Sequence, residues 1–197
     1  MFTMTTEKGI FMVILLSGTT RTGKTLMAQT LMEKHNIPYM SVDHLKMGLY
    51  RGLGDEKYNP EQKYTVLGET LWPVIKGIIL TAVENEQNLI IEGCYILPHM
   101  IKDIKKEYSK HVIPVFIGFT ENYIRNNYRK KIVGYQNIIE KRENDMLEKA
   151  DCLIQLHSEL KKRCEKDNIK MFEIDNDYEI EIEFAYKFID SKINLLK

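Results

Sequence analysis

Apolar and polar residues follow one another along the chain in blocks that predict strands and helices in turn. Residues 11–17 form a continuous apolar run, as expected of a strand that is covered on both faces. A helix is predicted over 24–35, a short second strand over 38–42 and a short helix over 43–50. Glycine, asparagine and proline then predict a loop over 51–61.

The second half of the chain continues this alternation. Residues 62–85 have helical periodicity with a kink expected at Pro73, and residues 89–92 and 112–119 read as a third and a fourth strand. A basic helical segment is predicted over 121–131 and a long helix over 137–166. A fifth strand at 171–174 and a closing helix over 177–196 complete the pattern.

Strands separated by helices predict a parallel sheet with helices on both faces. The expected fold class is α/β, a three-layer α/β/α sandwich with a five-stranded parallel sheet. The 197 residues are the size of one domain, and no linker divides them. Ligands of such sheets bind beyond the carboxyl ends of the strands, which is where chemistry is expected.

Composition narrows the classes of partner. The 28 basic and 28 acidic residues cancel, so the chain lacks the basic excess that is typical of nucleic-acid binders. Its three cysteines show no zinc or disulfide spacing, which favours a reducing cytoplasm. The first apolar run is shorter than the about 20 residues that cross a bilayer, so no membrane partner is expected. The long helix at 137–166 can dock on a second copy, and both monomer and homodimer stay open.

One motif carries specific chemistry. Residues 18–25 match G-x-x-x-x-G-K-[ST], between a buried strand and a helix. Backbone amides of such a loop surround phosphates, the lysine reaches the β and γ phosphates, and the last hydroxyl binds Mg²⁺. The motif predicts an ATP and Mg²⁺ site whose nucleotide contacts are Gly18, Thr19, Thr20, Arg21, Thr22, Gly23, Lys24, Thr25 and Leu26.

With this loop, a carboxylate after the second strand (Asp43) and the segment Ile-Ile-Glu-Gly-Cys-Tyr-Ile-Leu-Pro at 90–98, the chain resembles the P-loop small-molecule kinases. That group includes nucleoside monophosphate kinases, 2-phosphoglycerate kinases, chloramphenicol phosphotransferases and zeta-toxin-like kinases. The resemblance covers residues 10–142 and implies the fold of the P-loop nucleoside triphosphate hydrolases. It implies a single kinase domain over 1–197, with a core at about 10–120 and 137–197, an acceptor-binding region at about 43–72 and a lid at about 120–136.

The resemblance assigns roles at the acceptor side. A carboxylate at Asp43 contacts the acceptor hydroxyl and can act as general base, although Asp43 can also cap the following helix. Glu92 stands where these kinases have a Walker B carboxylate; it is either a second metal candidate beside Thr25 or a substrate-binding residue that orients the acceptor. Tyr95 either lines the acceptor pocket or is a core aromatic.

Basic residues are the other candidates. Arg51 is expected to bind an anionic group of the acceptor, although Lys46 replaces the arginine that is common in 2-phosphoglycerate-kinase-like sequences. Arg125 and Arg129 are four residues apart, and the resemblance places them on a lid that closes over the phosphates, or else on an exposed basic helix. Lys24, Asp43, Arg125 and Arg129 are therefore the predicted catalytic residues.

The remaining polar residues carry weaker expectations. Arg142 shares a helical stripe with apolar residues and is expected to point inward. The loop 175–177 resembles the one that borders adenine, and Asp177 can cap the last helix. The five histidines show no ligand spacing and are expected to be structural or exposed.

Three functions remain open from the sequence. The first is an ATP-dependent kinase that acts on a hydroxyl or phosphate of a small molecule, with a nucleoside monophosphate kinase as the alternative acceptor class. The second is a P-loop ATPase or nucleotide-driven switch, although the N-K-x-D guanine motif does not occur. The third is a nucleotide-binding protein without catalysis. The identity of the acceptor does not follow from the sequence.

Overall fold

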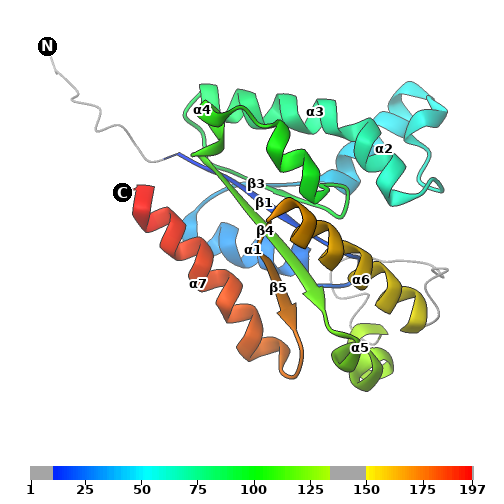
Figure 1. The fold of residues 1–197 in the computed structure, drawn as a ribbon. Coiled ribbons are helices and arrows are strands. Elements are labelled where there is room, and N and C mark those ends of the chain that lie inside the picture. The colour runs from blue at the N-terminus through cyan, green and yellow to red at the C-terminus, as the bar shows by residue number, and fades with distance from the viewer. Residues whose placement is uncertain (1–10, 134–149, 197) are drawn as a thin grey trace, which may run out of the picture.

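The computed structural model describes residues 11–133 and 150–196, and within them a five-stranded, all-parallel sheet is the centre of the fold (Figure 1). The spatial order is β2-β3-β1-β4-β5. The strands are β1 (Val13–Gly18), β2 (Tyr39–Ser41), β3 (Leu89–Glu92), β4 (Val112–Phe119) and β5 (Met171–Ile174). The predicted sheet is confirmed, and β3, β4 and β5 have the predicted bounds.

Helices cover both faces of the sheet, as the alternating pattern predicts. The α-helices are α1 (Lys24–His35), α2 (Val42–Leu53), α3 (Tyr64–Glu84), α4 (Lys106–Ser109), α5 (Glu121–Asn127), α6 (Ala150–Asp167) and α7 (Tyr178–Leu196). Shorter turns are η1 (Glu56–Tyr58) and η2 (Pro98–Asp103), both 3-10, and η3 (Tyr128–Val133), which is π-helical.

The two faces of β1 show how the core forms. Ile14 and Leu16 join one apolar cluster with residues of α1 and α7, whereas Val13 and Leu15 join another with residues of α3. All four side chains are fully buried. Burying each side chain of this size contributes about 1.5–3 kcal/mol, so a strand that is apolar at every position is stable only between two helical layers. Figure 1 shows these layers, with α3 on one side of the sheet and α1 and α7 on the other.

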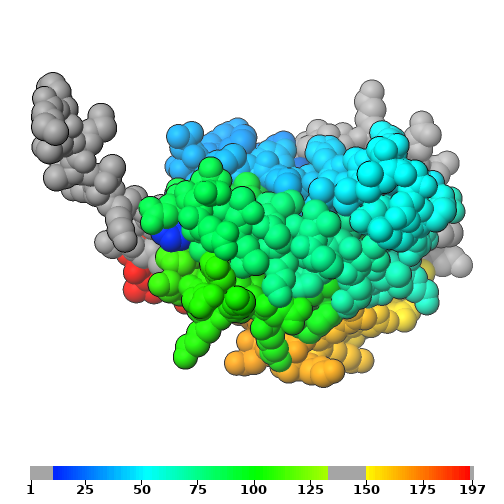
Figure 2. Space-filling view, turned by 90° about the horizontal axis from the view of Figure 1, so that it is seen from above, coloured from blue at the N-terminus to red at the C-terminus, as the bar shows by residue number. Residues whose placement is uncertain are grey.

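Helix α6 packs against the same apolar cluster as α3. Leu160 and Cys164 of α6 belong to the same apolar cluster as Leu71 and Ile75 of α3. The view from above shows α3 as a continuous surface with α6 along its edge (Figure 2). Within the described residues, α3 alone is long and apolar enough to meet a length and composition criterion for crossing a membrane, and a core helix meets the same criterion.

Several predicted boundaries shift in the structure. α2 continues to Leu53, and η1 forms inside the predicted loop. The α-helix predicted over 121–131 ends at Asn127, where the π-helical turn begins. Of the long helix predicted at 137–166 the structure shows Ala150–Asp167, and Arg142 lies outside the described residues.

Candidate active site

The sheet brings the predicted site residues to its carboxyl edge. Glu92, the last residue of β3, is in register with Leu16 of β1 on one side and Ser41 of β2 on the other. The phosphate-binding loop follows β1, and Asp43 lies in the first turn of α2, directly after β2. These three segments of the sequence therefore meet at one edge, where parallel sheets bind ligands.

The loop has the backbone of a phosphate-binding turn. Gly23 is left-handed, with φ 80°, and its carbonyl accepts the first helical hydrogen bond of α1, from Met27 N at 2.9 Å. Lys24 Nζ donates to the carbonyl of Thr19 at 2.7 Å, and Thr22 Oγ1 donates to the same carbonyl at 3.0 Å. Lys24 is buried and is the first residue of α1. Its ammonium is therefore held by its own loop at the amino-terminal end of a helix.

Tyr178, the first residue of α7, supports the loop from the side. Its hydroxyl donates to the carbonyl of Thr22 at 3.2 Å. A Cβ on Gly23 would lie 2.0 Å from the same hydroxyl oxygen and would have to displace it, and the φ of 80° also favours glycine there. Burial raises the pKa of Tyr178, which therefore stays a neutral hydrogen-bond donor.

His157 of α6 supports the loop from beneath. Its Nδ1 accepts the backbone N–H of Phe119 at 2.9 Å, and its Nε2 lies 2.5 Å from Thr19 Oγ1. Thr19 Oγ1 is also 3.0 Å from Nδ1, so the hydroxyl lies against the imidazole, close to both ring nitrogens. Burial lowers the pKa of His157 to about 3, and the charge of Lys24 adds to the effect. The ring is neutral at physiological pH.

The sequence prediction that the histidines are structural or exposed holds for His157, which is buried. The signal that was available is the stripe Leu153, His157, Leu160 and Cys164, which is buried at helical spacing in α6. A histidine in an apolar stripe has to find hydrogen-bond partners in the interior. The stripe does not reveal that one of these partners is the phosphate-binding loop.

On the acceptor side, Asp43, Lys46 and Tyr95 form a closed triangle of hydrogen bonds. Lys46 Nζ donates to Asp43 Oδ1 at 2.9 Å and to Tyr95 Oη at 2.6 Å. Tyr95 Oη donates to Asp43 Oδ1 at 3.2 Å. Lys46 and Tyr95 are buried, whereas the Asp43 side chain is 31% exposed. The carboxylate is thus oriented from the protein side and remains open to solvent on the other.

Lys46 is therefore part of the site, although the sequence indicated it only as a replacement for an expected arginine. The spacing of Asp43 and Lys46, three residues apart on a helix, is the signal for their pairing. The contact to Tyr95 joins residues 49 positions apart and depends on the fold.

Thr25 and Glu92 suit the metal that the motif implies. A threonine hydroxyl and a carboxylate are the hard oxygen donors that Mg²⁺ prefers, with phosphate oxygens of a nucleotide as the natural complement. Glu92 is 2% exposed and ends β3 at the same edge as the loop. In the described part of the chain no group of three or more His, Cys, Asp or Glu side chains is placed to hold a metal ion.

The three arginines predicted for the site lie on three different elements, α2, α5 and η3. Arg51 is exposed in the last turn of α2, at the opposite end of that helix from Asp43. Arg125 is exposed and forms ion pairs with Glu121 at 2.8 Å and Asp151 at 3.2 Å. Arg129 lies in η3, beyond the end of α5, so it does not share an α-helical stretch with Arg125. Their roles at the phosphates remain predictions.

The loop 175–177 is ordered by its own helix. The Glu181 carboxylate accepts the backbone N–H groups of Asp175, Asn176 and Asp177 at 2.6, 3.0 and 3.1 Å, and these bonds lower the pKa of Glu181. Asp177 Oδ1 accepts from Ile180 N at 3.1 Å, which confirms the predicted helix cap. The loop leads directly into Tyr178 and so lies beside the phosphate-binding loop.

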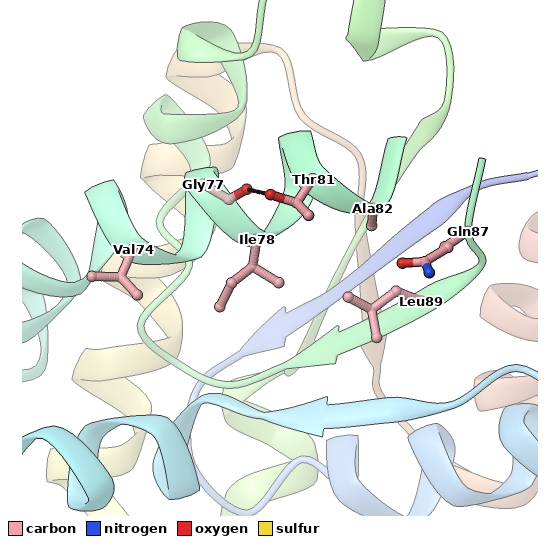
Figure 3. A pocket seen from close by; sticks show the side chains of 7 residues that line it. All are labelled: Val74, Gly77, Ile78, Thr81, Ala82, Gln87 and Leu89. Atoms are coloured by element: carbon pink, nitrogen blue, oxygen red, sulfur yellow. Dashed lines mark hydrogen bonds between the residues drawn. The ribbon is translucent and has the colours of Figure 1, made fainter. Parts of the chain in front are cut away.

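A separate pocket of about 310 Å³ lies at the other end of the sheet (Figure 3). It is formed by the second half of α3 and the start of β3, and its lining is mostly apolar: Val74, Gly77, Ile78, Thr81, Ala82, Gln87 and Leu89. Because β3 begins here and ends at Glu92, this pocket is distinct from the carboxyl edge that holds the loop.

Comparison with solved structures agrees with this geometry. A sugar kinase from Janibacter sp. matches with a TM-score of 0.54 and 17% identity, over 91% of this chain and 95% of that one. A deoxyadenosine kinase from M. mycoides (TM-score 0.53, 12% identity, 91% and 100% covered) and a shikimate kinase from Bacteroides thetaiotaomicron (0.52, 15%, 91% and 98%) are similar. No protein-family model and no curated protein sequence matches the chain. At these identities the likeness is one of fold, and that fold is the nucleotide-kinase fold of small-molecule P-loop kinases.

Proposed function

From a chain with the fold of the small-molecule P-loop kinases, we propose an ATP-dependent phosphotransferase that phosphorylates a hydroxyl group of a small molecule. The observation that carries the proposal is the oriented carboxylate of Asp43, which shares the carboxyl edge of the sheet with the phosphate-binding loop. A protein that only binds the nucleotide needs the loop but has no use for a carboxylate fixed in this way.

In the proposed reaction, residues 18–26 hold the triphosphate through backbone amides, and Lys24 moves from the Thr19 carbonyl to the β and γ phosphates. Thr25 and Glu92 would hold Mg²⁺ together with the phosphates, and the ion would supply charge neutralisation there. The acceptor oxygen forms a bond to the γ phosphorus as the bond to the β-phosphate oxygen breaks, and ADP leaves.

The acceptor proton passes to Asp43 in this scheme. Lys46 and Tyr95 orient the Asp43 carboxylate through Oδ1, and this carboxylate accepts the hydroxyl proton. Arg125 and Arg129 of the proposed lid at about 120–136 would neutralise charge on the transferred group, for which Arg125 would release its ion pairs with Glu121 and Asp151. Arg51 would bind an anionic group of the acceptor, if the acceptor carries one. ATP as the preferred nucleotide and a cytoplasmic location are part of the same proposal.

The test measures ADP production by the purified chain with ATP and Mg²⁺, alone and with pools of sugars, nucleosides, hydroxy acids and nucleoside monophosphates. Turnover that requires a hydroxyl acceptor, and that is lost in Lys24→Met and Asp43→Asn, supports the proposal. Turnover with nucleoside monophosphates alone would assign the chain to that alternative class. Hydrolysis without any acceptor, unchanged in Asp43→Asn, would refute the kinase in favour of an ATPase, and tight ATP binding with no turnover would indicate a binding protein.

A further inference from the structure

We propose that Ser41, the last residue of β2, is a positioning residue for Mg²⁺, and that its hydroxyl helps Thr25 and Glu92 to hold the ion that accompanies ATP. The inference rests on the proposed function and goes beyond it, because Ser41 lies outside the phosphate-binding motif. Three observations carry it: the burial of the hydroxyl, the face of the sheet on which it lies, and its level along α1.

The Ser41 hydroxyl is a buried polar group without a hydrogen bond in the described part of the chain. Ser41 is 4% exposed, and its Oγ has no partner among the described residues. A serine that precedes a helix usually accepts a backbone N–H of the first turn, but Ser41, directly before α2, forms no such bond. Burying a hydroxyl without a partner costs free energy, so this group points to a partner from outside the chain.

The register of the sheet decides on which face the hydroxyl lies. Ser41 is paired with Glu92 of β3, which is paired with Leu16 of β1. Paired residues of neighbouring parallel strands point to the same face, and Leu16 belongs to the apolar cluster that includes residues of α1. Tyr39, two residues before Ser41, packs against the same cluster. Ser41 and Glu92 therefore both lie on the face that α1 covers, on adjacent strands.

One hydrogen bond sets the level of β2 against α1. Gln29 Nε2 of α1 donates to Tyr39 Oη at 3.4 Å. α1 runs opposite to the strands, because it begins at the carboxyl edge, where β1 ends, and packs back on β2 and β3. The step from Gln29 back to Thr25 covers about 6 Å towards that edge, and the step from Tyr39 to Ser41 covers about 6.6 Å. Thr25 and Ser41 are thus at about the same level, on α1 and on the strand that it covers.

Together these side chains form a set of oxygen donors that suits Mg²⁺ bound to phosphates. Thr25 offers a hydroxyl, Glu92 a buried carboxylate and Ser41 a second hydroxyl. Mg²⁺ usually keeps several of its waters beside a nucleotide, so side chains also hold it through those waters. In this arrangement a coordinated water donates to Ser41 Oγ. The same turn then serves both sides of the site, because Asp43 follows Ser41 by two residues.

The experiment measures the Kd of the full chain for ATP by calorimetric titration, once with Mg²⁺ in excess and once with EDTA. Ser41→Ala removes the hydroxyl and leaves the rest of the side chain. We expect its Kd with Mg²⁺ to rise about 3- to 10-fold, the equivalent of one hydrogen bond, and its Kd with EDTA to stay unchanged. Glu92→Gln should show a loss of affinity that likewise depends on Mg²⁺.

Thermal unfolding without nucleotide gives a second readout, and Ser17 provides a matched control. Ser17 is 1% exposed near the end of β1, but its hydroxyl donates to the carbonyl of Ile96 at 2.7 Å. Ser17→Ala should therefore lower the Tm and keep the ratio of the two Kd values. Ser41→Ala should leave the Tm unchanged or raise it, because it removes no hydrogen bond shown for the described residues.

Unchanged ATP affinity in Ser41→Ala, or an equal rise of the Kd with Mg²⁺ and with EDTA, would overturn the inference. A Tm of Ser41→Ala as low as that of Ser17→Ala would overturn it as well, because the hydroxyl would then have a structural partner. Absence of ATP binding by the unaltered chain would refute the proposed function, and this inference with it. The two failures are distinguishable, since only the second is seen without any substitution.

Discussion

Replacing Lys46 with methionine tests the acceptor side of the site most directly. Methionine has nearly the length of the lysine stem but no charge, so the change removes both hydrogen bonds of Lys46 and keeps most of its packing. The carboxylate of Asp43 loses its cation and the hydroxyl of Tyr95 loses a donor. We expect losses of both stability and activity, with different origins.

The size of the stability loss follows from burial. Breaking a fully buried ion pair by removing one partner costs about 3–5 kcal/mol. Here the lysine side chain is 8% exposed but the Asp43 side chain is 31% exposed and keeps part of its hydration. We therefore expect a loss of about 1–2 kcal/mol, which lowers the Tm of a domain of this size by about 3–6 °C.

The expected activity loss comes from misorientation of Asp43. Without Lys46, Oδ1 loses one of its two donors shown here, and a displaced general base lowers kcat by up to about 100-fold. In the double variant with Asp43→Asn, the carboxylate charge that Lys46 neutralised is gone, so stability should return towards that of the wild type while activity stays lost. Steady-state kinetics and thermal unfolding on the same samples measure both quantities.

Lys57→Met is the matched control, because Lys57 forms an ion pair of 2.8 Å with Asp55 on the surface. It should change neither kinetics nor the unfolding midpoint. If Lys46→Met retained wild-type kcat, or if Asp43→Asn restored its activity, the assignment of the triangle to catalysis would be wrong.

Three further predictions concern packing, pH and thiol chemistry. Gly93→Ala would place a Cβ 2.7 Å from Val42 Cβ, so we expect a loss of about 1–3 kcal/mol in denaturant unfolding. The pKa of His157 in the folded state is about 3, below its usual value of 6.5. Its stabilising contribution is therefore full above pH 6.5 and is lost as the pH falls from there towards 3. In His157→Asn, the free energy of unfolding should lack this component of the pH dependence between pH 7 and 4. Burial raises the pKa of the Cys164 thiol to about 12, whereas Cys152 is exposed, so mass spectrometry after brief alkylation at pH 8 should find label on Cys152 and none on Cys164.

The fold and the nucleotide side of the site were accessible from local sequence. An apolar run such as residues 13–16 can be buried only between two layers. A glycine-rich loop of this pattern, between such a strand and an amphipathic helix, commonly binds the phosphates of a nucleotide. Asp43 and Glu92 could be placed as well, because each ends or follows a strand and parallel strands end at the same edge.

The rest was decided by contacts between segments far apart in the chain. Thr19 meets His157 across 138 residues, Thr22 meets Tyr178 across 156, and Lys46 meets Tyr95 across 49. Periodicity and spacing report which face of an element is buried, but a hydrogen bond depends on positions to within a few tenths of an ångström. Only the packed tertiary structure sets those positions. It brings the buried His157 against the phosphate-binding loop and Lys46 against Tyr95.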